Sequence, residues 1–200
     1  MKTKSINLRF SLLAALILLA AFSRIIPHMA NFSPLGAISL FGAAHFSKKW
    51  QAFLIPIAAT WLSDLFINNV IYAQYYPTFT WFYEGFYWQY GSYLLITLLG
   101  IFIFKKVNVS RVAGGALISS AIFFIVTNFA CWPGYPQTAD GLATCYAAGI
   151  PYLKGTLLSD LFYSGALFGL FALLQSRIPA LQYQSSQFNL NQLYKNQKIK

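Results

Sequence analysis

The chain has 200 residues, of which 58% are hydrophobic and 9% charged, and its formal net charge is +10 at pH 7. A chain of this length with so few charges is too apolar for a soluble domain and is expected to lie in a lipid bilayer. Its Lys and Arg residues lie in short clusters between apolar runs, not along a solvated face, which argues against nucleic acid as a partner. The expected fold class is all-α, a polytopic membrane protein.

Six apolar runs predict six transmembrane helices in a single membrane domain of residues 1–176, followed by a polar tail of residues 177–200. The predicted spans are residues 10–26, 32–46, 52–71, 88–104, 112–130 and 152–175. The first run could instead belong to a signal peptide cleaved after Ser23. A retained span is favoured, because the apolar residues continue to Ile26 and Arg24 would directly follow the cleavage point.

The second span is too short to cross a bilayer by itself. Residues 35–46 would rise about 18 Å as a helix, whereas the hydrocarbon core is about 30 Å thick. The polar, proline-containing stretch of residues 27–34 must therefore also lie at membrane depth, which is tolerated only where the backbone faces protein or a watery cavity. Broken segments of this kind indicate the binding site of a transporter.

Two long connections separate the later spans. Residues 131–151 contain several Pro and Gly residues, which predict a loop with at most a short helix over residues 139–148. Residues 72–93 are rich in Trp, Tyr and Phe, which fits either an interfacial aromatic belt or a lid over a flat ligand. Cys131 and Cys145 can form at most one disulfide, and both are predicted on the outer side.

The basic residues predict which side of the membrane each end of the chain faces. With six spans and both termini cytoplasmic, nearly all of them fall on the cytoplasmic side, as in other inner-membrane proteins. These residues are Lys2, Lys4, Arg9, Lys48, Lys49, Lys105, Lys106, Arg111, Arg177, Lys195, Lys198 and Lys200. Arg24 and Lys154 fall near the outer face. The chain is therefore expected to be a multi-pass protein of the cell inner (cytoplasmic) membrane.

Two of the four acidic residues lie inside apolar spans. Asp64 and Asp160 occupy the same position in two copies of the sequence LSDLF. An ionised Asp at the centre of a bilayer costs about 3 kcal/mol on insertion scales, so a chain keeps one there only where another group pairs with it or uses it. Both are predicted about 10 to 12 Å below the outer boundary, at the level that Arg24 and Lys154 approach from above.

These charged groups and the polar side chains near them form the candidate solute-binding site. The predicted binding residues are Asp64, Asp160, Arg24, Asn31, Asn128, Lys154 and His28. Two structural ion pairs that tie helices together explain the four charges nearly as well. Helix capping is the alternative for Asn31, and interfacial anchoring is the alternative for His28. No metal site or cofactor is expected, because His28 and His45 lack a second ligand at metal-binding spacing.

The chain is not expected to be an enzyme, and no catalytic residue is predicted. Ser and Asp are adjacent in each LSDLF motif, so their side chains point about 100° apart on a helix and cannot form a nucleophile and base dyad by themselves. An intramembrane aspartyl hydrolase that shares a proton between Asp64 and Asp160 is a less favoured alternative.

Three segments carry a resemblance to known membrane proteins: ANFSPLGAISLFGAAHF, CWPGYP and GLATCYAAGIPYLKGTLLSDLF. They resemble an uncharacterised bacterial six-span membrane family that is itself similar to the substrate-binding S components of energy-coupling-factor (ECF) transporters. The chain is similar to the S components also in its length, its six predicted spans and its cytoplasmic termini. This resemblance implies a monomeric subunit that binds a small, vitamin-like solute below its outer loops and is energised by a partner transporter complex.

One feature departs from the S-component pattern. S components offer Ala-x3-Ala on the first helix to dock the coupling subunit, whereas here only Ser11 and Ala15 fit a small-x3-small pattern. A similar six-span outline belongs to the cell-shape scaffold protein of the MreD type, which binds protein partners instead of nutrients. The expected function is solute binding or transport in the membrane, and a membrane scaffold is the alternative.

Overall fold

The computed structural model describes residues 2–181, and the side chains of residues 8–181. This part of the chain is helical and contains no strand, as expected for a backbone that must satisfy its own hydrogen bonds in lipid. Its α-helices are α1 (Lys2–Phe22), α2 (Leu35–His45), α3 (Lys49–Phe66), α4 (Phe86–Ile103), α5 (Val109–Phe129) and α6 (Ala139–Arg177). All of them except α2 are long and apolar enough to cross a membrane. The predicted tail beyond Leu181 lies outside the described residues.

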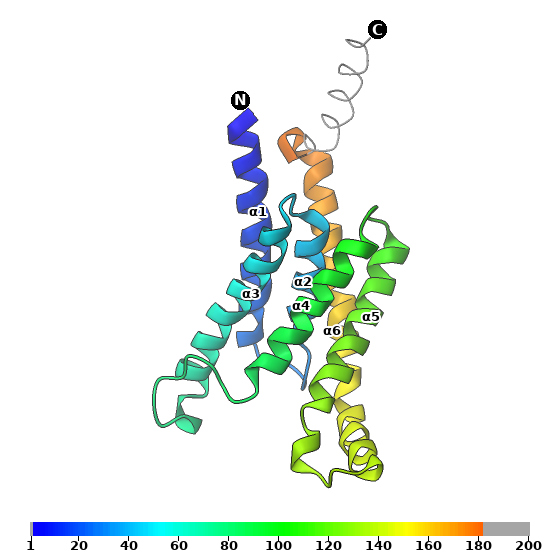
Figure 1. Ribbon diagram of the computed structural model, residues 1–200. Helices are drawn as coiled ribbons and strands as arrows, with labels where there is room; N and C mark the ends of the chain where they lie inside the picture. Colours follow the sequence, from blue (N-terminus) through cyan, green and yellow to red (C-terminus); the bar gives the residue numbers. More distant parts are fainter. Residues whose placement is uncertain (1, 182–200) are drawn as a thin grey trace.

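Successive helices run in opposite directions, so the start of α1 and the end of α6 lie at the same end of the bundle (Figure 1). The connections that precede α4 and α6 lie at the other end. Short helical turns shape the connections: η1 (Ser23–Ile25), the π-helical η2 (Ile67–Ile71), η3 (Ala73–Tyr75) and η4 (Trp132–Gly134). The number of membrane crossings and the side of the membrane that each terminus faces stay predictions.

α2 is the central helix of the bundle. It contacts each of the five other α-helices, and every residue from Leu35 to Gly42 is buried. Its 11 residues rise about 16 Å, roughly half of the hydrocarbon thickness. The predicted span of residues 32–46 is therefore not a spanning helix. A short, apolar helix surrounded by other helices takes its place, and residues 26–34 lead into it without helical structure.

α6 overturns the prediction of a long loop over residues 131–151, because the helix already begins at Ala139 and continues through Pro151. Thr138 caps its start by accepting a hydrogen bond from the Gly141 backbone N–H at 3.1 Å. A Cβ added to Gly141 would overlap with the Pro136 carbonyl, and one added to Gly149 would overlap with the Asn128 amide. Close packing, not a turn, is thus the reason for these glycines.

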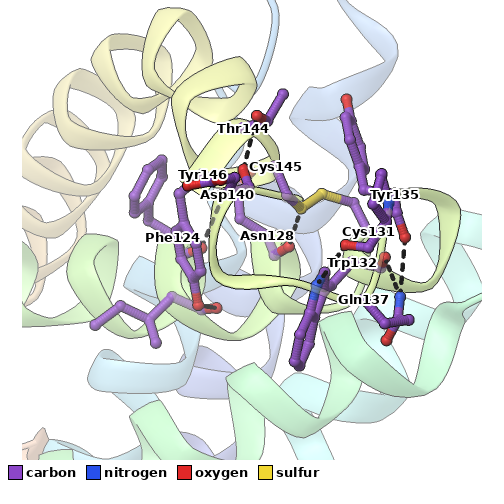
Figure 2. The surroundings of a disulfide bond; sticks show 12 residues. Phe124, Asn128, Cys131, Trp132, Tyr135, Gln137, Asp140, Thr144, Cys145 and Tyr146 are labelled. Atoms are coloured by element: carbon purple, nitrogen blue, oxygen red, sulfur yellow. Dashed lines mark hydrogen bonds between the residues drawn. A yellow bond between two sulfur atoms is a disulfide. The ribbon is translucent and has the colours of Figure 1, made fainter. Parts of the chain in front are cut away.

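One disulfide, Cys131–Cys145, joins the loop after α5 to the first part of α6 (Figure 2). The loop also binds itself through Gln137, whose side-chain N–H group donates to the Trp132 carbonyl at 2.8 Å and to the Tyr135 carbonyl at 3.0 Å. α6 has 39 residues and is about 58 Å long, nearly twice the hydrocarbon thickness. The disulfide-linked start of α6 lies at the end of the bundle opposite the start of α1 (Figure 1).

The other end of the bundle has a core of aromatic rings around His45. The imidazole lies 4.6 Å from the Phe171 ring and 4.7 Å from the Phe41 ring, measured between centroids. Arg9 donates to the Leu181 carbonyl at 2.9 Å and lies over the Phe171 ring at 5.2 Å, a distance suited to a cation–π interaction. His45 is therefore packed against aromatic side chains of α2 and α6.

Candidate functional site

The first buried carboxylate, Asp64 on α3, is fully bonded within the protein. It is 5% exposed, and Arg24 Nη1 donates to its Oδ1 at 2.6 Å. Tyr90 on α4 donates its hydroxyl to Oδ2 at 2.8 Å. Arg24 Nη1 also donates to Ser63 Oγ at 2.9 Å. The two carboxylate oxygens therefore each have a donor, and the charge of Asp64 is balanced by Arg24.

The second buried carboxylate, Asp160 on α6, has a hydrogen bond but no cation. It is 2% exposed, and Ser120 on α5 donates to its Oδ2 at 2.8 Å. Among the side chains of residues 8–181, the pair between Arg24 and Asp64 is the only ion pair, so no basic side chain described balances Asp160. No described group donates to its Oδ1 with hydrogen-bonding geometry, although the Ser119 hydroxyl lies close to this carboxylate.

A cavity of about 240 Å³ lies between the end of α1, the first turn of α2 and the helices α4, α5 and α6. Its lining residues are Arg24, His28, Asn31, Ser33, Leu35, Gly36, Gln89, Tyr93, Phe123, Thr156 and Asp160. The lining combines charged and polar side chains with aromatic ones. Among the aromatic residues, the Tyr93 and Phe123 rings stack with centroids 5.8 Å apart and an interplanar angle of 13°. A solute there meets hydrogen-bonding groups and flat rings together.

The polar segment before α2 forms one wall of the cavity. Asn31 has a left-handed backbone with φ of 57°, a conformation that Asn tolerates better than most residues. Pro34, not Asn31 or Ser33, occupies the N-cap position of α2, and no side chain caps that helix. The neighbouring Ala30 carbonyl lies where a Cβ of Gly155 would be, so the segment rests directly on α6.

The structure brings four of the predicted binding residues to this one cavity: Arg24, His28, Asn31 and Asp160. Asp64 lies behind Arg24 and does not line the cavity. Asn128 lines an adjoining cavity of about 80 Å³, to which Asn31, Phe123 and Thr156 also contribute. Lys154 is exposed and lines neither cavity, because six residues separate it from Asp160 and place it about 120° away around α6.

The sequence signal for the two carboxylates is longer than LSDLF. A Thr precedes each Asp by four residues, giving TWLSDLF in α3 and TLLSDLF in α6. The Ser before each Asp donates to the carbonyl of that Thr, at 2.8 Å for Ser63 and 2.9 Å for Ser159. Both Ser residues and both Asp residues are buried, whereas Leu62 and Leu158 are exposed. Each motif therefore directs its polar pair inward and its leucine outward.

Several residues of the site were not predicted from the sequence. These are Ser120, Tyr90, Gln89, Tyr93, Phe123, Thr156 and Gly36. One pattern could have identified Ser120, because it lies 40 residues before Asp160, as Arg24 lies 40 residues before Asp64. The described residues contain no group of three His, Cys, Asp or Glu side chains that could hold a metal ion.

Comparisons with known proteins give a family but no function. No curated protein and no solved structure matches the chain, so the fold and the site rest on the geometry described above. A family of unknown function, DUF6580, matches residues 4–181, which include all six α-helices apart from the first two residues of α1. The chain belongs to this family.

Proposed function

We propose that this protein is a membrane subunit that binds and helps to transport a small solute, in the manner of the S components of ECF transporters. The observation that carries the proposal is that Asp160, a buried carboxylate without a described cationic partner, lines the same cavity as Arg24. An ionisable group inside a membrane bundle is a functional-site candidate by default, and its partner has to be named. The partner proposed here is the solute.

The contrast between the two aspartates argues against a purely structural role for both. Asp64 has the features of a structural ion pair, with a guanidinium at 2.6 Å and a tyrosine hydroxyl at 2.8 Å. A second structural pair at Asp160 would need a basic residue beside it, and no described side chain supplies one. Buried charges are normally paired, so the carboxylate of Asp160 is explained better by a bound group than by packing.

The size of the cavity limits the solute. Pockets for drug-sized ligands measure about 300 to 1,000 Å³, whereas this one measures about 240 Å³. A compact, vitamin-like molecule with one ring fits this volume and the stacked Tyr93 and Phe123. Under the positive-inside rule the disulfide-linked end of the bundle is the outer side of the inner membrane, and the solute enters from there.

Native mass spectrometry of the protein purified in mild detergent tests the proposal. We expect the wild-type protein to retain a small molecule that the Asp160→Asn variant loses, with both variants folded. If neither form retains a molecule and Asp160→Asn instead loses a co-purifying protein, the scaffold function is supported. Cleavage of a membrane peptide that depends on both aspartates would support the hydrolase.

A further inference from the structure

We infer that the solute is an organic monocation whose planar N–H donor group binds Asp160 Oδ1, as the Arg24 guanidinium binds Asp64 Oδ1. The inference rests on the proposed function and names the class of solute. It comes from comparing the two copies of the TxxSDLF motif, because the protein itself provides a cation for one copy and not for the other.

The two carboxylates have matching surroundings. Arg24 and Asp64 are separated by 40 residues, and so are Ser120 and Asp160. In each case the earlier residue donates to the carboxylate of the later one. Ser120 therefore has the same separation from its aspartate as Arg24 has, although it donates to the other carboxylate oxygen, and it brings no positive charge.

The hydrogen bonds of the carboxylates differ at one oxygen. Asp64 Oδ2 accepts from the Tyr90 hydroxyl and Asp160 Oδ2 accepts from the Ser120 hydroxyl, both at 2.8 Å. Asp64 Oδ1 accepts from a guanidinium, whereas Asp160 Oδ1 has no described donor. A charged donor at that oxygen would complete the second site in the way Arg24 completes the first.

Ser119 provides the second acceptor that such a donor needs. Arg24 Nη1 donates both to Asp64 and to Ser63 Oγ. At the second site Ser119 is 0% exposed and its Oγ has no hydrogen-bond partner. A Cβ added to Gly36 would overlap with both Asp160 Oδ1 and Ser119 Oγ, so these two oxygens lie next to each other against α2, and Gly36 and Asp160 both line the cavity.

The charge of the site selects a cation. The set comprises one partly exposed guanidinium, Arg24, and two buried carboxylates, Asp64 and Asp160, so with both carboxylates ionised one further positive charge makes the set neutral. An anionic solute would leave three negative charges against the single positive charge of Arg24 in a low-dielectric region, which is strongly unfavourable. Arg24 donates through Nη1 alone among its described bonds, and its remaining N–H groups can donate to an acceptor atom of the solute.

The aromatic lining favours a flat cation. Tyr93 and Phe123 line the cavity together with Asp160, and a planar amidinium or aminopyridinium ring gains from contact with such rings as well as from the carboxylate. Planar N–H groups also match the two acceptors better than a single ammonium does.

Three related probes test this: benzamidinium, its neutral analogue benzamide and its anionic analogue benzoate. The readout is the thermal unfolding of the detergent-solubilised protein, followed by tryptophan fluorescence. We expect benzamidinium to raise Tm by about 3 to 6 °C at ten times its Kd, and the other two probes to have no effect. Asp160→Asn, which is nearly isosteric, should weaken benzamidinium binding at least tenfold.

Gly36→Ala should have the same effect without any change of charge, because its methyl group would overlap with Asp160 Oδ1 and Ser119 Oγ and displace the Asp160 carboxylate. Gly114→Ala on α5 is the matched control, since a Cβ there meets nothing within 4 Å. If benzamide or benzoate stabilises the protein as well as benzamidinium does, or if the benzamidinium effect survives Asp160→Asn, the inference is overturned. The proposed function would survive that result provided that the native protein still retains a small molecule, so the two failures are distinct.

Discussion

Replacing Asp64 by Asn should destabilise the folded protein, whereas the same replacement at Asp160 should not. Removing one partner of a buried ion pair costs about 3 to 5 kcal/mol, because the other charge is left without compensation. The Arg24 side chain is 17% exposed and the Asp64 side chain 7%, and Arg24 also borders the cavity. This partial solvation places the expected loss for Asp64→Asn near the lower limit, about 3 kcal/mol.

Asp160→Asn removes a buried charge that has no described partner. The amide oxygen can keep the hydrogen bond from Ser120, so the unfolding free energy of the variant should change by about 1 kcal/mol or less in either direction. Two substitutions of the same chemistry, at equivalent positions of a repeated motif, therefore have different consequences.

Thermal unfolding in a single detergent without added solute measures the difference. A loss of about 3 kcal/mol corresponds to a fall in Tm of about 6 to 12 °C for a domain of this size. Glu84→Gln is a control, because Glu84 is an exposed carboxylate in the loop before α4. If Asp64→Asn unfolds at the wild-type temperature, or if both Asp variants lose the same stability, the distinction between a paired and an unpaired aspartate is wrong.

Three further predictions follow from other contacts. Replacing Arg24 and Asp64 together by Leu should restore most of the stability that Asp64→Asn loses, because no lone charge remains; the double variant is compared with each single one by Tm. Replacing Cys131 and Cys145 together by Ser should lower the free energy of unfolding by about 3 kcal/mol for a loop of this size. Adding reductant to the wild-type protein should lower its free energy of unfolding by the same amount. Gly155→Leu should displace residues 26–34, because the side chain enters the space of a backbone carbonyl; the variant should lose benzamidinium binding while still inserting into the membrane.

The helices were predictable from the sequence because a bilayer leaves the backbone few alternatives. The bounds of α4 and α5 differ from the predicted spans by only a few residues at each end. The short length of α2 was also evident from residues 35–46. Its position at the centre of the bundle was not, since sequence does not say which helix is surrounded by the others.

The continuation of α6 from Ala139 through Pro151 could not be predicted, because its glycines have two meanings. Pro and Gly normally indicate a loop, yet Gly141 and Gly149 lie in a helix where neighbouring chain segments leave no room for a side chain. A proline inside a helix is tolerated where it removes a single hydrogen bond. These contacts join residues of different segments and exist only once the helices have packed.

Of the site, the sequence supplied the charges but not their partners. Asp64, Asp160 and Arg24 were identified from the cost of charge in lipid, and all three lie at or beside the cavity. The depth of these residues along each helix was predictable, whereas the face of the helix on which each side chain lies was not predicted. Lys154 illustrates this, because it lies at a suitable depth but on a face of α6 that does not line the cavity. The contact of Ser120 with Asp160 depends on how α5 packs against α6.

The most direct measurement is an experimental density map of the protein purified in lipid nanodiscs with benzamidinium present. If a cation binds Asp160 as proposed, we expect non-protein density in the cavity, within hydrogen-bonding distance of Asp160 Oδ1 and beside the Tyr93 ring. A map in which a protein side chain donates to Asp160 Oδ1 and closes the cavity would contradict it.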